Sequence, residues 1–184
     1  MAEIVMRSLV QTRGVASNWT IDSAGRYRAA SSLLFRHLTT PLAAGTAAYH
    51  VGDEPDSRTV KVCRKNLGTS MPNIDDIRGR QVHRSDFDKF ELVLCMDKSN
   101  LHDVREPSSR YLATSIACAS SRDRHAQLHS IRPAGSKAEV RLLGSFDPQG
   151  ESIIEDPYYG GIDGFQHNFQ QVMRCCNEIL DQYQ

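Results

Sequence analysis

The segment of residues 153–160 holds the side chains of this sequence that are best suited to acid chemistry. Asp156 is followed by Pro157 and by two aromatic residues, Tyr158 and Tyr159. A carboxyl group beside a rigid proline can protonate a leaving group, while flat aromatic rings hold a substrate. In isolation the same residues favour a plain turn, in which Asp156 bonds to its own backbone and the two tyrosines pack. Glu155 is expected to be a solvated neighbour rather than half of a catalytic pair.

The charge balance of the chain excludes some classes of partner. Its 184 residues include 22 Lys and Arg against 22 Asp and Glu, so the formal net charge is zero. A neutral chain lacks the broad positive field that nucleic acid or an anionic membrane surface selects. Its longest apolar run, residues 92–96, is too short to span a bilayer. We therefore expect no nucleic-acid partner and no membrane.

The cysteines and the first residues indicate a reduced compartment. Five cysteines are an odd number, no two of them form a Cys-x2-Cys pair, and no signal-peptide pattern opens the chain. This combination argues against a disulfide framework and against a zinc site. We expect a cytoplasmic protein that uses no metal and no other cofactor.

Hydrophobic spacing predicts the elements that must position these side chains. Residues 92–96 form an uninterrupted apolar run, which predicts a strand buried on both faces. Residues of about 162–183 carry apolar side chains at alternating spacings of four and three, which predicts a long helix with one buried stripe. Further elements are a helix over 2–13, a strand over 20–24, a helix capped by Asp56 and closed by Gly68, a short helical turn after Ser85, and a strand over 139–144.

Strands separated by helices imply a parallel α/β sheet within one domain that spans residues 1–184. Two stretches, at about 26–45 and 107–135, do not fit this order. The second is rich in serine, arginine and alanine and shows no clear periodicity. We expect both stretches to be surface loops or disordered segments inserted into the domain.

Several segments together resemble the low-molecular-weight protein tyrosine phosphatases. The pairing of Gly-Ser-Phe-Asp-Pro-Gln with a following Asp-Pro-Tyr-Tyr is the most specific match, since a lone Asp-Pro would mean little. The resemblance runs from Met1 to the last helix and is broken only by the two inserted stretches. The matching segments are residues 19–24, 49–52, 55–58, 80–82, 86–87, 94–97, 99–101, 142–149, 153–160 and 174–176.

The resemblance implies a fold and a mechanism. The fold is a small α/β domain with a four-stranded parallel sheet and helices on both faces. Such phosphatases hydrolyse phosphotyrosine through a cysteinyl-phosphate: a cysteine thiolate attacks phosphorus, and the arginine of a Cys-x5-Arg loop grips the phosphate oxygens. By resemblance Asp156 is the general acid that protonates the leaving oxygen, and Tyr49, Tyr158 and Tyr159 flank the substrate. The partners implied are phosphotyrosine-containing proteins or small aryl phosphates.

The resemblance also predicts that part of this machinery lies ahead of residue 1. In the family the Cys-x5-Arg-Ser loop joins the first strand to the first helix, and Met1-Ala2-Glu3 aligns with the opening of that helix. We expect this chain to lack the first, central strand, the nucleophile and the arginine, and to be inactive and of low stability as it stands. A non-catalytic regulatory or interaction isoform that uses Tyr158 and Tyr159 as a recognition surface is the alternative.

One internal segment imitates the missing loop. Cys118 and Arg124 satisfy Cys-x5-Arg, but no glycine lies between them and the carboxylate of Asp123 would repel phosphate. We interpret the match as accidental, because such a motif functions only between a strand and a helix.

Ile77 stands where the family usually has a histidine, which is a further departure. Both insertions begin near Arg-Tyr and end in Ala-Gly, and we hypothesise that they are translated introns.

Overall fold

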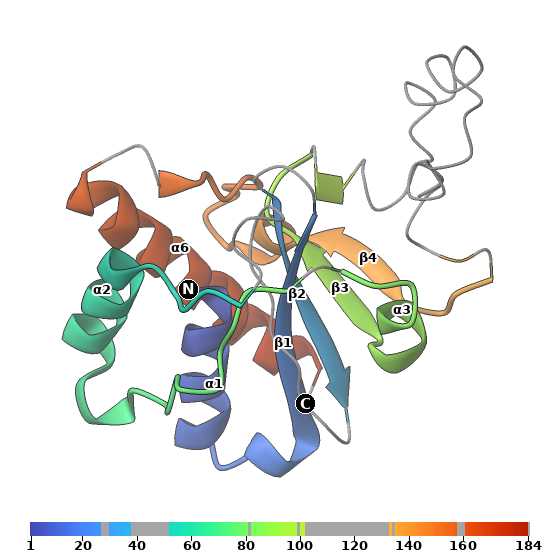
Figure 1. Cartoon of the computed structure of the whole chain (residues 1–184), viewed down its shortest axis with the longest axis horizontal. Coiled ribbons are helices and arrows are strands. Elements are labelled where there is room, and N and C mark those ends of the chain that lie inside the picture. Colours follow the sequence, from blue (N-terminus) through green and yellow to red (C-terminus); the bar gives the residue numbers. More distant parts are fainter. Residues whose placement is uncertain are drawn as a thin grey trace.

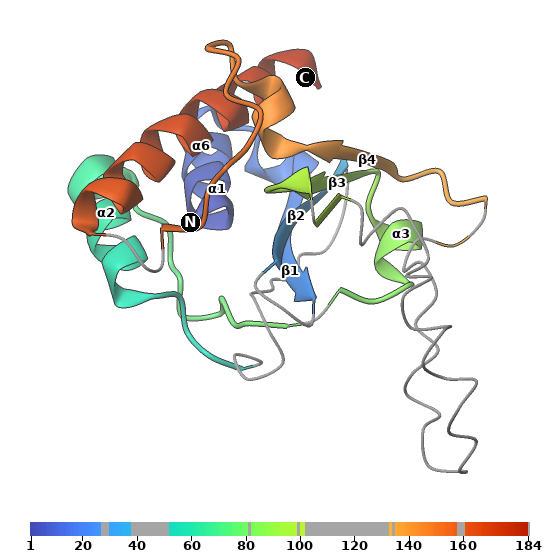
Figure 2. The same ribbon diagram turned by 90° about the horizontal axis from the view of Figure 1, so that it is seen from above.

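The computed structural model describes residues 1–26, 30–37, 52–80, 82–98, 100–101, 133, 135–157 and 161–183. Within them a single sheet separates two groups of helices (Figures 1 and 2). Helices α1 (Ala2–Thr12), α2 (Ser57–Leu67) and α6 (Ile162–Gln182) lie on one side, and the short α3 (Asp86–Lys89) lies on the other. Three 3₁₀ turns complete these elements: η1 (Ala16–Asn18), η3 (Gly68–Ser70) and η4 (Leu143–Phe146).

The sheet has the strand order β1 (Trp19–Arg26), β2 (Ala30–His37), β3 (Leu92–Cys95) and β4 (Glu139–Leu142). Strands β3 and β4 are parallel, whereas β2 runs antiparallel to both β1 and β3. Strands β1, β3 and β4 therefore share one direction. The α/β class is confirmed, but the prediction of a purely parallel sheet is wrong for β2.

Strand β2 also corrects the prediction that residues 26–45 form only a surface loop or disorder. Residues 30–37 pair with β1 from Ala30–Arg26 to His37–Trp19 and with β3 from Ser32–Cys95 to Phe35–Leu92. A strand in this place supplies hydrogen-bond partners to two backbone edges that would otherwise be unpaired. The open gap that we expected at the centre of the sheet is therefore not present. The second stretch, 107–135, lies almost entirely outside the described residues.

Strand β3 is buried on both faces, as its apolar run predicts. Leu92 and Leu94 belong to the larger hydrophobic cluster, together with α1 and α6. Val93 and Cys95 point to the other face, where they join Phe87, Phe90 and Val140. This alternation follows the two-residue repeat of a strand, and it explains why no polar residue interrupts the run.

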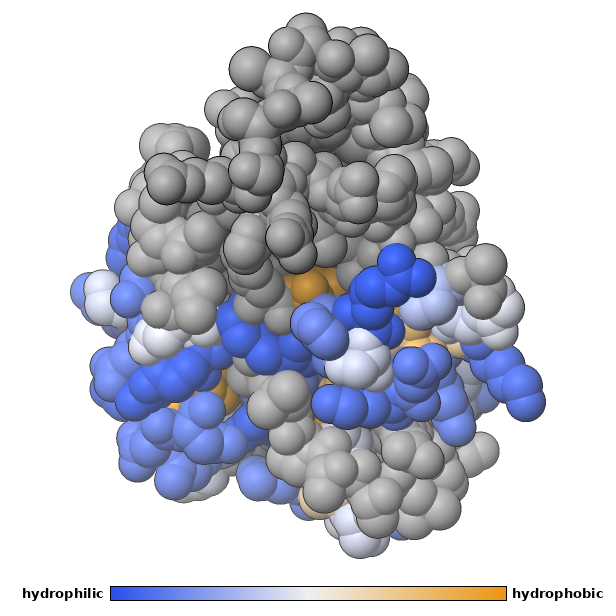
Figure 3. Space-filling model, turned by 45° about the vertical axis from the view of Figure 1, so that its right-hand side comes forward, coloured by the Kyte–Doolittle hydropathy of each residue, from blue (hydrophilic) through white to orange (hydrophobic). Residues whose placement is uncertain are grey.

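Helix α6 shows the predicted stripe. Its buried apolar residues include Phe165, Phe169, Val172, Cys176 and Ile179. Burial of an aliphatic or aromatic side chain of this size contributes roughly 1.5–3 kcal/mol each, so this helix is a principal support of the core. Few large apolar side chains remain exposed among the described residues, namely Ile162 and Tyr183. The face in Figure 3 is accordingly mostly hydrophilic in its described part.

The predicted cap at Asp56 is confirmed, and a second carboxylate caps the turn after β3. The side chain of Asp56 accepts a hydrogen bond from the backbone N–H of Arg58 at 2.7 Å, at the start of α2. Asp97 accepts from the backbone N–H of Asn100 at 2.7 Å, directly after β3. Both carboxylates satisfy amide groups that have no partner within their own helix.

Candidate active site

The acid loop, residues 151–157, connects the turn after η4 to the segment that opens α6. Its anchor is Ile154, whose side chain is buried and whose backbone N–H donates to the Met96 carbonyl at 2.9 Å. Met96 directly follows β3, so the loop is attached at the carboxyl end of this strand. Asp156 is exposed. The carboxyl ends of parallel strands are where α/β proteins place their ligands, so the loop lies at a suitable edge of the sheet.

Two buried amide side chains of α6 hold the loop backbone in place. Gln171 donates from Nε2 to the carbonyl oxygens of Glu151 and Ile153, both at 2.9 Å. Asn168 donates from Nδ2 to the Glu155 carbonyl at 2.8 Å. Asn168 and Gln171 are three residues apart and so lie on one face of the helix. Three loop carbonyls are thereby satisfied, and the last of them immediately precedes Asp156.

Arg174, one turn further along α6, ties the acid loop to the preceding turn. Its Nε and Nη2 donate to the two carboxylate oxygens of Asp147 at 2.8 and 2.7 Å. The same Nη2 donates to Glu151 Oε2 at 2.9 Å. These hydrogen bonds hold the pKa of Asp147 below its usual value. A bidentate pair of this kind fixes orientation as well as distance, so Arg174 positions the start of the loop.

The backbone of Gly144 passes very close to the backbone of Glu151 and Ser152 at the start of the acid loop. A Cβ atom at Gly144 would lie 2.5 Å from the Glu151 carbonyl oxygen and 2.5 Å from the backbone of Ser152. Backbone atoms cannot retreat from such an overlap as a flexible side chain can, so only glycine fits. At the other end of the loop, Pro157 packs against Gly164 of α6, where a Cβ would lie 3.3 Å from the proline Cβ.

The other residues predicted for the site cannot be located. Tyr49, Tyr158 and Tyr159 lie outside the described residues, as do Cys118 and Arg124 of the accidental motif. The structure therefore describes Asp156 and the framework beneath its loop. Ile77, at the position where we expected a family histidine, is buried in the larger hydrophobic cluster.

None of the four described cysteines suits a nucleophilic role. Cys63, Cys95, Cys175 and Cys176 are all buried. Burial raises the pKa of the Cys63 thiol, raises that of Cys175 to about 12, and raises that of Cys176 further. An attacking cysteine needs a lowered pKa and access to its substrate, so these thiols are packing groups.

A buried charge network between β1 and α3 was not predicted. Arg80 bonds to Asp22 Oδ2 at 2.8 Å and to Asp86 Oδ2 at 2.7 Å, and both carboxylates are almost fully buried. Burial raises the pKa of Asp22 to about 7, and repulsion from Glu3 adds to the rise, although the hydrogen bond and the charge of Arg80 oppose it. A charged residue inside the predicted strand of residues 20–24 was the available signal, but its partner is 58 residues away.

Glu3 extends this network towards the start of α1. It is buried, accepts a hydrogen bond from Ser23 Oγ at 2.6 Å, and pairs with Arg7 at 2.7 Å. Burial raises the pKa of Glu3 as well. The beginning of α1 is thus tied to the C-terminal half of β1 by polar contacts, at a place where sequence spacing alone predicted only an apolar helix face.

Neither a metal centre nor a membrane segment is found in the described part of the chain. No group of three His, Cys, Asp or Glu side chains is arranged there to hold a metal ion. No described helix combines the length and the apolar character needed to cross a membrane. No model of a known protein family matches the chain.

Individual proteins do match it over nearly its full length. The low molecular weight phosphotyrosine protein phosphatase of Rattus norvegicus is 35% identical over 181 residues, covering 98% of this chain and 85% of the relative. The proteins of the same name from Homo sapiens and Dictyostelium discoideum are 33% and 31% identical, covering 98% of this chain and 85% and 83% of their own lengths.

Solved structures share the fold at lower identity. The crystal structure of a protein tyrosine phosphatase from Entamoeba histolytica superposes with a TM-score of 0.61 at 23% identity, covering 98% of this chain and 85% of the other. The structure of YfkJ from Bacillus subtilis gives a TM-score of 0.63 at 18% identity, covering 98% and 83%. At these identities the superpositions establish a common fold and no more.

Proposed function

Because this chain belongs to the low molecular weight phosphotyrosine protein phosphatase family, we propose that its acid loop serves the hydrolysis of phosphotyrosine, with Asp156 as the general acid. The observation that carries this proposal is the exposed Asp156 on a loop held by Gln171, Asn168 and Arg174 at the carboxyl end of β3. The substrates are phosphotyrosine-containing proteins or small aryl phosphates.

Proton donation is the step for which this loop is suited. A phenolate is a poor leaving group at neutral pH, because the pKa of tyrosine is about 10. A carboxylic acid that protonates the bridging oxygen as the bond to phosphorus breaks contributes typically about 10²- to 10⁴-fold to the rate. Tyr158, Tyr159 and Tyr49 complete the proposal as aromatic walls beside the substrate ring.

A suitable nucleophile is not found in the part of the chain that the structure describes. The four described thiols are buried, and the Cys118 motif lacks the glycine of a phosphate loop. We propose that these 184 residues, which form one domain, do not turn over substrate when produced alone. The acid acts when a strand and a Cys-x5-Arg-Ser loop are joined ahead of α1.

Hydrolysis of an aryl phosphate tests both parts. We expect no turnover by residues 1–184, and turnover by the same chain once the strand and the Cys-x5-Arg-Ser loop precede Met1. In the extended chain Asp156→Asn should lower kcat about 10²-fold or more, whereas the matched control Glu155→Gln should change it less than about twofold. Equal effects of the two substitutions would refute the role of Asp156.

Two further outcomes would redirect the proposal. Turnover by residues 1–184 that disappears in Cys118→Ser would make Cys118 the nucleophile and overturn the proposed dependence on an upstream loop. An extended chain that folds, yet neither binds nor hydrolyses aryl phosphates, would favour the non-catalytic interaction role.

A further inference from the structure

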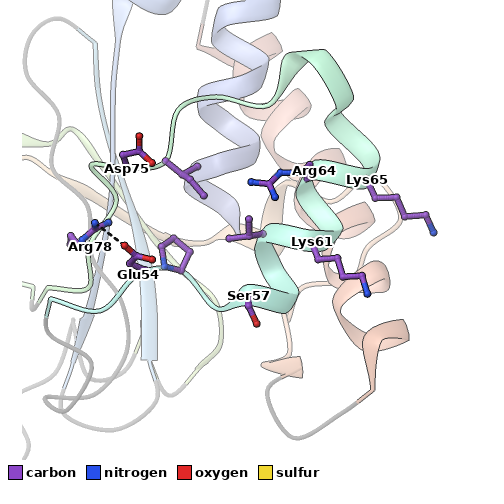
Figure 4. Close-up of a pocket in the computed structure, with 10 residues that line it drawn as sticks. Glu54, Ser57, Lys61, Arg64, Lys65, Asp75 and Arg78 are labelled. Carbon is purple, nitrogen blue, oxygen red and sulfur yellow. Dashed lines mark hydrogen bonds and ion pairs between the residues drawn. The ribbon is translucent and has the colours of Figure 1, made fainter.

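A pocket of about 610 Å³ lies between α2 and the two segments that flank it, away from the acid loop itself (Figure 4). One flank is the turn before α2 and the other is the passage after η3. Its size falls in the range of ligand-binding pockets, roughly 300–1,000 Å³. The residues that line it are Glu54, Pro55, Ser57, Val60, Lys61, Arg64, Lys65, Ile74, Asp75 and Arg78.

The rim of this pocket is basic. Lys61, Arg64 and Lys65 follow one another at positions i, i+3 and i+4 of α2, so they share a helix face. All three are exposed, and in the described part of the chain no carboxylate pairs with them. In Figure 4 Lys61 and Lys65 extend outward from the helix, whereas Arg64 turns towards the pocket. Three unpaired cations in so small an area stand out on a chain whose net charge is zero.

On the opposite side of the pocket, one arginine forms an ion pair with a glutamate. Arg78 bonds to Glu54 at 3.0 Å, as the dashed line in Figure 4 marks. Asp75 is the other acidic residue of the lining, so the lining holds four cations and two carboxylates. The remaining surface includes the apolar groups of Pro55, Val60 and Ile74, none of which is fully buried. Cations around an apolar floor favour a ligand that combines negative charge with an aliphatic group.

The start of α2 links this pocket to the acid loop. Arg58, next to Ser57 of the lining, stacks its guanidinium 4.6 Å from the ring centre of Phe165 on α6. The neighbouring Gly164 is in turn the residue against which Pro157 packs. The first turn of α6 therefore contacts both the start of α2 and the end of the acid loop.

We propose that this pocket binds an acidic peptide segment of a protein substrate, with carboxylates on Lys61, Arg64 and Lys65 and one aliphatic side chain on the apolar floor. The assignment of that segment to a phosphotyrosine protein rests on the proposed function, whereas the binding of an acidic peptide does not. Nucleic acid fits less well, because it demands an extended positive field and the chain has no net positive charge.

Fluorescence anisotropy with a labelled, unphosphorylated peptide tests the proposal. The peptide carries several glutamates around a single leucine and is titrated with the 184-residue chain at low ionic strength. The double variant Lys61→Glu, Lys65→Glu should weaken binding at least about fivefold, as expected for two exposed charge pairs. The matched control Lys89→Glu, Lys137→Glu makes the same charge change at exposed sites away from the pocket and should alter binding less than about twofold.

Changes in the peptide, rather than in the protein, test which kind of ligand the pocket binds and do not affect the folding of the protein. Replacing the leucine by serine should weaken binding about threefold or more, because the apolar floor then loses its partner. Unchanged binding by that peptide, or an equal loss in both double variants, would overturn the proposal. Displacement of the peptide by inorganic phosphate alone would reduce the pocket to a simple anion site and also overturn it.

A single-stranded oligonucleotide provides the remaining comparison. It should bind more weakly than the peptide and respond equally to both double variants. Tighter binding that depends on Lys61 and Lys65 would assign the pocket to nucleic acid instead. None of these measurements involves turnover, so a failure of the proposed hydrolysis leaves them intact, and a failure of peptide binding leaves the hydrolysis assay intact.

Discussion

Replacing Asp22 by asparagine should change how the stability of this protein depends on pH. Asp22 is completely buried in β1 and shares the guanidinium of Arg80 with Asp86. One cation between two buried carboxylates, with Glu3 nearby, leaves an excess of negative charge in a poorly solvated place. Burial accordingly raises the pKa of Asp22 from 3.8 to about 7 in the folded protein.

The sign of the effect follows from the proton balance. Between about pH 4 and pH 7 the folded protein holds a proton on Asp22 that the unfolded chain has released. The stabilisation from this proton is complete below about pH 4 and is lost as the pH rises towards 7. A pKa difference of about three units corresponds to at most about 4 kcal/mol. We expect about 2 kcal/mol, because Arg80 can move towards the ionised carboxylate and offset part of the cost.

Urea unfolding from pH 4.5 to 8 measures this effect, with the single tryptophan, Trp19 at the start of β1, as the fluorescent probe. Asp22→Asn keeps the size and an acceptor oxygen but cannot titrate. Its free energy of unfolding should therefore fall less than that of the unmodified chain as the pH rises. Asp88→Asn removes an exposed carboxylate of α3 and serves as the control. Parallel pH profiles for the unmodified chain and Asp22→Asn would refute the reasoning.

Three further outcomes test the support of the acid loop and the state of the cysteines. Gly144→Ala should lower the free energy of unfolding in urea by at least about 3 kcal/mol, since its Cβ would overlap the backbone of Glu151 and Ser152. The control Gly161→Ala places its Cβ in open space and should lower it by less than about 1 kcal/mol. Arg174→Ala should lower the free energy of unfolding by about 2 kcal/mol, because the buried Asp147 carboxylate then lacks its charged partner. Arg174→Lys keeps the charge and should recover part of this loss. Equal losses in the two variants would contradict the bidentate role. Cys63, Cys95, Cys175 and Cys176 should react with a thiol reagent at pH 8 only after urea is added, and rapid labelling of any of them in the folded protein, located by mass spectrometry, would contradict their burial.

Much of the helical framework could be predicted because its signals are local. The apolar spacing of α6, the uninterrupted run of β3 and the cap at Asp56 each depend on a few neighbouring residues. Strand β2 was missed for the opposite reason. Residues 30–37 carry only a short apolar group and no turn signal that we recognised, and they become a strand by pairing with β1 and β3. Such pairing is a property of the neighbours as much as of the segment.

The candidate site divides in the same way. Asp156 could be singled out because Asp-Pro-Tyr-Tyr follows Gly-Ser-Phe-Asp-Pro-Gln, a pairing of two short motifs that is specific to the family it resembles. The residues that hold its loop could not, since Gln171 and Arg174 lie 20 and 23 positions from Glu151. In the sequence they are ordinary polar residues of a helix. Only the packing of α6 against the loop turns them towards its carbonyl groups and carboxylates.

By itself the sequence determined the class of fold, the long helices and the family, and it singled out Asp156 as the candidate acid, because helix periodicity, capping and short motifs are written in adjacent positions. The tertiary structure alone decided that β2 lies between β1 and β3, that Arg80 joins Asp22 to Asp86, and that α6 holds the acid loop. Hydrogen bonds and ion pairs of this kind join groups far apart along the chain. Their partners are set by which surfaces meet when the core closes, and no local pattern encodes that choice.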